Sequence, residues 1–326
     1  MAKPRLLITL GDVAGVGPEI VARAWPDLIR FADPIVIGDL GWVKRGIEMT
    51  GSSANVQTIT APAEAKPDGL SIPCLQATTQ NLERVASGKV SSEAGRAAYD
   101  FLCAAIDLTL AKQADAIVTC PLHKEGLAGA GIKHPGHTEI LAERTGTKNF
   151  AMVLWGDGIA VAHVTLHMAL RDIFQHLTTP AVLEKIRLLN VLLPKLLDRP
   201  ARIAVAALNP HGSDGGLFGN EEETILAPAV ALAQKEGIDV SGPWPADTLF
   251  VRAHKKEFDG IVAMYHDEGH IAMKLRCGWR CVNISAGLPI VRTSVAHGTA
   301  YDIAAKGVAD PVSLIEAAHV AARLAR

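Results

Sequence analysis

Short apolar runs rich in β-branched residues alternate along the chain with longer stretches of helical periodicity. Such runs, bounded by polar or glycine-containing segments, are typical of buried strands. They lie at 6–10, 34–37, 116–119, 151–154, 159–162, 203–206, 261–264 and 282–284. Apolar residues recur on one helical face over 92–112, 180–197, 221–236 and 311–324. Because strands alternate with helices, the sequence predicts an α/β fold with a mostly parallel sheet.

The length and charge of the chain exclude several classes of protein. The 326 residues suffice for two domains of roughly 150 residues each. Lysine and arginine total 32 against 34 acidic residues, so the net charge is −2 and gives no electrostatic case for nucleic acid as a partner. No apolar run approaches the roughly 18 residues that a membrane span requires, so no membrane segment is expected.

The start of the chain and its cysteines predict a cytoplasmic location. The apolar stretch 6–10 is too short for a secretory signal. The five cysteines are odd in number, scattered and without a CxxC pair. We therefore expect reduced thiols and no cysteine-based zinc site.

A glycine-rich turn, Gly11–Glu19, directly follows the first predicted strand, and Pro18 suits the first turn of a helix. Turns of this kind can bind anions at the helix start. The chain contains neither GxGxxG nor GxxxxGK[ST], so neither the usual dinucleotide fingerprint nor a P-loop is present. The alternative is a tight strand-to-helix turn without a ligand.

Three histidines each stand where an apolar run stops and the sequence turns polar or glycine-rich. They are His167, His211 and His266. If these runs are parallel strands, the three imidazoles lie at carboxyl ends, where open α/β sheets bind their ligands. Three neutral imidazoles could hold a divalent metal and leave positions for substrate. The alternative is three separate histidines that hydrogen-bond loop backbone.

Other polar residues are candidates for binding an anionic substrate or for acid–base chemistry. Thr138, after His137, can cap the helical run 140–145 and leave its first N–H groups to face an anion. Lys274 and Arg292 flank the predicted strand 282–284, which contains Asn283, and the two cations could clamp a phosphate or carboxylate. The alternatives are an ordinary helix cap and solvated surface charges. Asp247 is a candidate acid–base group or a helix cap.

Six segments in order carry a family resemblance along almost the whole chain. They are Gly11–Glu19, Pro135–Glu139, Leu208–His211, Pro245–Thr248, Ala263–Gly269 and Gly287–Ser294. Through them the sequence resembles the 4-hydroxythreonine-4-phosphate dehydrogenase family, the PdxA-type enzymes.

The resemblance implies roles for residues that the motifs had already singled out. His167, His211 and His266 would hold one divalent metal, zinc, cobalt or magnesium, in a site shared across the interface of a homodimer. A phosphorylated substrate would contact His137, Thr138, Lys274, Asn283 and Arg292. Asp247 and Lys274 are the catalytic candidates, and His137 is a further candidate for the proton acceptor.

The resemblance also implies a fold and a cofactor. The fold would be that of isocitrate and isopropylmalate dehydrogenases, with two α/β/α lobes and the active site in the cleft. The first lobe would comprise residues 1–125 and 286–326, and the second residues 126–285. Those enzymes bind NAD without a GxGxxG turn, so NAD is the expected cofactor, with NADP as an alternative.

The implied reaction is oxidation, with decarboxylation, of 4-hydroxy-L-threonine 4-phosphate to 3-amino-2-oxopropyl phosphate in pyridoxal phosphate synthesis. A sister group oxidises 4-phospho-D-threonate or 4-phospho-D-erythronate to dihydroxyacetone phosphate, and a more distant branch oxidises a terephthalate dihydrodiol. Two positions depart from the family pattern, since Val13 replaces a usual proline and Ala296 a common aspartate. Outside the family, the rival interpretations are a binding protein for phosphorylated acids and a metal-dependent hydrolase.

Overall fold

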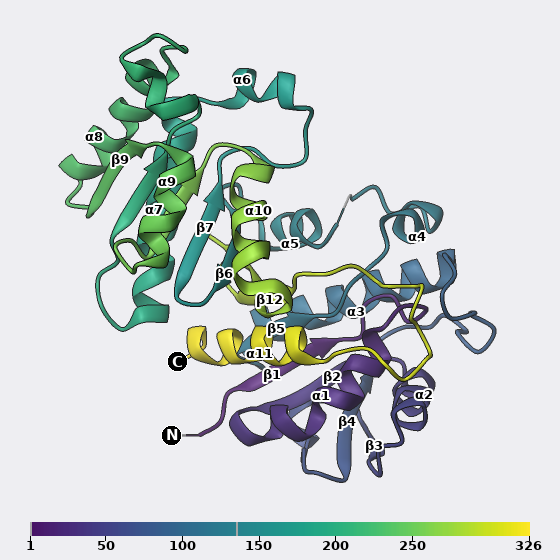
Figure 1. The fold of residues 1–326 in the computed structure, drawn as a ribbon. Helices are drawn as coiled ribbons and strands as arrows, with labels where there is room; N and C mark the ends of the chain where they lie inside the picture. The colour runs from purple at the N-terminus through teal and green to yellow at the C-terminus, as the bar shows by residue number, and fades with distance from the viewer. Residues whose placement is uncertain (1, 135) are drawn as a thin grey trace. The chain divides into compact units, whose positions relative to one another are not determined.

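The computed structural model describes residues 2–134 and 136–326 and divides into two compact units (Figure 1). The first unit comprises Met1–Lys148 and Leu288–Arg326, and the second Asn149–Gly287. Residues 126–148, which the sequence analysis assigned to the second lobe, lie in the first unit. The reason is that this stretch packs on the helix over 92–110, to which Arg144 is tied by an ion pair with Asp107.

The first unit contains a fully parallel sheet in the order β3-β4-β2-β1-β5-β12. The strands are β1 (Arg5–Thr9), β2 (Asp33–Gly38), β3 (Asn55–Ile59), β4 (Ser71–Gln76), β5 (Ala116–Thr119) and β12 (Val291–Val295). In β1, consecutive residues Leu6, Leu7 and Ile8 are all fully buried. Because successive side chains point to opposite faces, both faces of this sheet are covered.

Six α-helices cover this sheet and its loops. They are α1 (Gly17–Phe31), α2 (Leu40–Thr50), α3 (Ser92–Leu110), α4 (Lys124–Gly129), α5 (His137–Thr145) and α11 (Val312–Leu324), with a short 3-10 turn η1 (Pro62–Glu64). The helix α3 packs on β1, β2 and β5, and α11 packs on β5 and β12. A serine caps α3, since the Ser91 hydroxyl accepts the N–H of Ala94 at 3.1 Å.

The second unit contains a mixed sheet in the order β11-β6-β7-β10-β8-β9. The strands are β6 (Ala151–Gly156), β7 (Ile159–His163), β8 (Ile203–Ala206), β9 (Val240–Trp244), β10 (Gly260–Ala263) and β11 (Val282–Ala286). β6 is antiparallel to both of its neighbours, β11 and β7. β7, β10, β8 and β9 run parallel to one another.

Helices again lie against this sheet. They are α6 (Ile173–His176), α7 (Thr179–Leu197), α8 (Ala227–Lys235), α9 (Ala246–His254) and α10 (His266–Cys277), with short turns η2 (Leu170–Asp172), η3 (Pro210–Asp214), the π-helical η4 (Glu222–Leu226) and η5 (Gly278–Arg280). α7 packs on β7, β8 and β10, and α10 packs on β6, β7 and β10. In the described ranges 2–134 and 136–326, no helix is long and apolar enough to cross a bilayer.

The predicted α/β fold with a mostly parallel sheet is confirmed. All eight apolar runs form strands, and the four predicted helical stretches form α3, α7, η4 with α8, and α11. Four strands were missed: β3, β4, β9 and β12.

Asp259 fastens the starts of three strands in the second unit. It is 4% exposed, and its carboxylate accepts hydrogen bonds from the Arg199 guanidinium at 2.7 and 2.9 Å and from the backbone N–H of Arg202 at 2.9 Å. Its own N–H donates to the carbonyl of Arg202, directly before β8. Its carbonyl accepts the N–H of Ala160, near the start of β7. Burial by itself raises the pKa of Asp259, but the hydrogen bonds from Arg199 and Arg202 outweigh it and hold the pKa at about 2.

We predict that Asp259→Asn lowers the free energy of unfolding by about 2 kcal/mol at pH 7, because buried donors lose their charged acceptor. The pKa of Asp259 is lower in the folded protein than in the unfolded chain. Its contribution to the free energy of unfolding is therefore complete above about pH 4 and disappears as the pH falls towards 2. Urea unfolding of both proteins between pH 7 and pH 3 measures this. Asp239→Asn, at an exposed position, is the control, and an equal loss in both variants at pH 7 would contradict the prediction.

Candidate active site

The three predicted histidines follow the carboxyl ends of three adjacent parallel strands. β10 pairs with β7 on one side and β8 on the other. His167 lies in the loop after β7, His211 in η3 after β8, and His266 begins α10 after β10. Thr165 donates both its backbone N–H and its hydroxyl to the carbonyl of Met264, at 3.1 and 2.7 Å. This pair of bonds ties the loop of His167 to the loop of His266.

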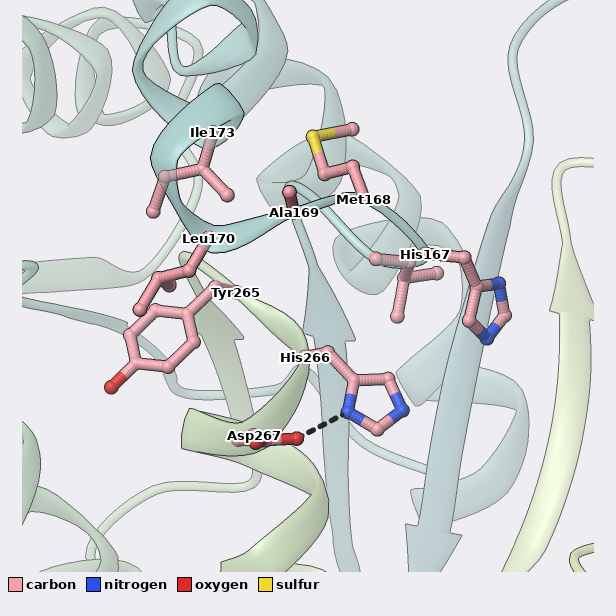
Figure 2. Close-up of a pocket in the computed structure, with 9 residues that line it drawn as sticks. His167, Met168, Ala169, Leu170, Ile173, Tyr265, His266 and Asp267 are labelled. Atoms are coloured by element: carbon pink, nitrogen blue, oxygen red, sulfur yellow. Dashed lines mark hydrogen bonds and ion pairs between the residues drawn. The ribbon is translucent and has the colours of Figure 1, made fainter.

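His167 and His266 line one pocket, of about 640 Å³ (Figure 2). Their ring centroids are 5.8 Å apart. Nδ1 of His266 lies 2.6 Å from a carboxylate oxygen of Asp267, which assigns the proton to Nδ1 and leaves the lone pair on Nε2. Ligating histidines are typically held in this way by a carboxylate. The rest of the lining is mainly apolar: Leu166, Met168, Ala169, Leu170, Ile173 and Tyr265.

His211 lies apart from this pocket in a strained turn. His211, Gly212 and Ser213 have φ values of 55°, 70° and 72°, in the left-handed region. Glu222 holds the turn, since its carboxylate accepts the N–H of Asn209 at 2.7 Å and the hydroxyl of Ser213. Burial by itself raises the pKa of Glu222, but these hydrogen bonds outweigh it and lower the pKa.

The imidazole of His211, like that of His266, has an aspartate carboxylate beside its Nδ1. Nδ1 of His211 lies 3.1 Å from a carboxylate oxygen of Asp214, and its side chain is 67% exposed. Across the described residues, 2–134 and 136–326, no three or more His, Cys, Asp or Glu side chains are grouped so that they could hold a metal ion. The fold therefore brings the three histidines to one sheet edge but not into one coordination sphere.

Two further histidines that the sequence analysis missed lie beside His266. His163 ends β7 and is 1% exposed, and its Nε2 is 3.2 Å from Nδ1 of His270 on α10. The rings of His266 and His270 stack with centroids 3.7 Å apart. Burial, reinforced by the neighbouring imidazoles, lowers the pKa of His163 to about 3 and that of His270 to about 4. The HxxxH spacing of 266 and 270 was the available signal.

Lys274 and Asn283 belong to the second unit, and Asp247 does too. Lys274 is eight residues beyond His266 on α10, so the two share a helical face with His270. Asn283 lies on β11, and its buried Oδ1 has no hydrogen-bond partner in the part of the chain that the structure describes. Asp247 is exposed in the first turn of α9, where it accepts the N–H of Thr248 at 2.9 Å.

His137, Thr138 and Arg292 belong to the first unit. Arg292 on β12 is 2% exposed and donates to the hydroxyl of Thr119 at 2.6 Å. Burial lowers the pKa of Arg292 to about 9, although Glu139 opposes the shift. His137 begins α5, and burial together with the charge of Arg292 lowers its pKa well below the usual value. A buried cation beside a helix N-terminus suits an anionic ligand.

The glycine-rich turn is tightly packed by its own unit. Gly11 has a φ of 65°, and a Cβ there would lie 2.2 Å from the carbonyl oxygen of Pro121. Asp12 is fully buried, and one of its carboxylate oxygens accepts the hydroxyl of Tyr301 at 2.8 Å. Burial raises the pKa of Asp12 despite that bond. Packing alone therefore explains why the chain requires a glycine at position 11.

Comparison with known proteins gives relatives along the whole chain. A 4-hydroxythreonine-4-phosphate dehydrogenase from Beijerinckia indica is 44% identical over 98% of this chain and 94% of its own length. A D-threonate 4-phosphate dehydrogenase from Salmonella typhimurium is 42% identical over the full length of both chains. The crystal structure of a 4-hydroxythreonine-4-phosphate dehydrogenase from Klebsiella pneumoniae has a TM-score of 0.90 at 38% identity and covers 99% of this chain and 98% of its own.

A family model gives the same result. The model described as pyridoxal phosphate biosynthetic protein PdxA matches residues 30–321. This match spans most of both structural units and all the predicted metal and substrate residues. The chain belongs to the PdxA family.

Proposed function

We propose that this protein is a dehydrogenase that oxidises a CH–OH group of a 4-phosphorylated hydroxy acid, with NAD and one divalent metal. The first candidate substrate is 4-hydroxy-L-threonine 4-phosphate, which would give 3-amino-2-oxopropyl phosphate after loss of carbon dioxide. The observation that carries the proposal is the placement of His167, His211 and His266 after adjacent parallel strands, in a chain similar to dehydrogenases along its length.

The histidines fit a divalent metal by their donor chemistry. Asp267 and Asp214 each hold Nδ1 of a histidine, so Nε2 of His266 and of His211 is the nitrogen available to a ligand. His167 would complete the set. A bound metal supplies a Lewis acid that polarises the oxygen of the reacting alcohol, and bound NAD supplies the hydride acceptor.

A homodimer with a shared metal site is part of the proposal. His211 is largely exposed, and it lies in the same unit as His167 and His266 without lining their pocket. An exposed, carboxylate-held imidazole supports a role for His211 in a site completed by a second copy of the chain.

The other residues would bind and orient the substrate. The Arg292 guanidinium and the start of α5, with His137 and Thr138, supply donors for an anionic group. Lys274 supplies a second cation, and the buried Oδ1 of Asn283 is an acceptor for a substrate hydroxyl or ammonium group. Asp247, Lys274 and His137 are the candidates for the group that accepts the hydroxyl proton.

A second candidate substrate is D-threonate 4-phosphate, or the related 4-phospho-D-erythronate. A D-threonate 4-phosphate dehydrogenase that is 42% identical over the full chain favours this candidate. That identity nearly equals the 44% of a 4-hydroxythreonine-4-phosphate dehydrogenase. The two classes differ in the group at carbon 2 and require the same metal and hydride chemistry.

Measurement of NADH formation by metal-loaded enzyme separates these candidates. We expect turnover with 4-hydroxy-L-threonine 4-phosphate to exceed that with 4-phospho-D-threonate and 4-phospho-D-erythronate. Preference for a sugar acid would transfer the proposal to the second candidate. Absence of NADH with all three substrates would contradict the proposed function.

We predict that Arg292→Met raises KM for the phosphorylated substrate by about 100-fold, because the anion loses a desolvated cation. Methionine keeps much of the buried volume, so the fold is retained. Steady-state kinetics measure the effect, with Arg30→Met at a 75% exposed side chain as the control. An unchanged KM in a folded Arg292→Met variant would exclude Arg292 from the substrate site.

A further inference from the structure

His270 covers one face of the His266 ring. The two residues are one helical turn apart on α10, their ring centroids are 3.7 Å apart and their planes are inclined by 10°. Asp267 contacts the same His266 ring at its edge, through Nδ1. The imidazole of His266 is therefore constrained from two directions, although its side chain is 37% exposed.

The ring of His270 is itself fixed by two hydrogen-bond partners. Its Nδ1 is 3.1 Å from the backbone carbonyl of His266 and 3.2 Å from Nε2 of His163. A carbonyl oxygen only accepts, so Nδ1 of His270 carries the proton and donates. Nε2 of His163 accepts the same proton in a shared bond.

His163 provides a rigid support for this arrangement. It is 1% exposed at the end of β7 and therefore has little freedom to move. Gly269 allows α10 to approach it, because a Cβ at that position would lie 2.3 Å from Nε2 of His163. The rings of His163 and His270 lie with their centroids 4.7 Å apart and their planes inclined by 39°.

We propose that His270 is a positioning residue whose ring, held by His163 and by the His266 carbonyl, keeps the His266 imidazole oriented for metal binding through Nε2. This inference rests on the metal-dependent function proposed above. Stacking is the contact that His270 makes with the ligand ring, and its hydrogen bonds serve to hold its own ring in place. An aromatic ring without nitrogen at position 270 should therefore preserve most of the effect.

The test compares His270→Ala and His270→Phe in the full-length, metal-free protein. Co²⁺ affinity is measured by competition with a chromophoric chelator, and the visible spectrum of the bound Co²⁺ is recorded. We expect His270→Ala to bind Co²⁺ about 10-fold more weakly, as for other residues that orient metal ligands. His270→Phe should bind almost as tightly as wild type, and the spectrum should keep its band positions in both variants because the ligands are unchanged. His254→Ala, which removes an exposed imidazole at the end of α9, is the control.

Each other outcome overturns the proposal in a distinct way. Wild-type affinity in His270→Ala would show that the ring does not orient His266. Equal weakening in His270→Phe and His270→Ala, with thermal unfolding showing both to be folded, would assign the effect to a nitrogen of His270 and not to its stacking. Shifted Co²⁺ bands would make His270 a ligand. Failure of the wild-type protein to bind Co²⁺ would instead contradict the proposed function itself.

Discussion

The parallel pairing of β7, β10 and β8 is the constraint on which the candidate site depends. Parallel strands end at the same edge of a sheet, and in this unit each of the three is followed by a histidine that the sequence had singled out. The bonds from Thr165 to the carbonyl of Met264 then join two of the three loops. At the opposite edge of the sheet, Asp259 joins the starts of the same strands by hydrogen bonds. Hydrogen bonds therefore connect these strands at both of their ends.

Most of the strands that the sequence predicted are apolar on both faces, whereas in β11 Val282, Ile284 and Ala286 alternate with Asn283 and Ser285. The four missed strands each contain residues that weaken the pattern. β3 is a polar edge strand, and β4 includes Pro73, which has no N–H for the sheet. β9 contains Gly242 and Pro243. β12 was missed because three consecutive polar residues separate its two valines, and one of them is a buried arginine, Arg292, which hydrophobic patterning assigns to the surface.

The candidate site could be predicted only in part, for similar reasons. Residue type and position after apolar runs were enough to select His167, His211 and His266. Their separation was not predictable, because the left-handed backbone at His211 and its carboxylate partner, Asp214, depend on how Glu222 folds back on the turn. His163 was missed because it belongs to an apolar strand, where a histidine is usually a structural residue of the core. Its contact with His270 depends on the packing of α10 on β7, which the sequence pattern does not show.

We propose that the histidines at this sheet edge bind one catalytic divalent metal. The most direct measurement is anomalous diffraction at the zinc absorption edge from crystals of the metal-loaded full-length protein. We expect one anomalous peak per active site within bonding distance of Nε2 of His266, with His167 and a His211 imidazole as the other protein ligands. A peak bound only elsewhere, or no peak at these histidines in crystals of protein active with zinc, would contradict it.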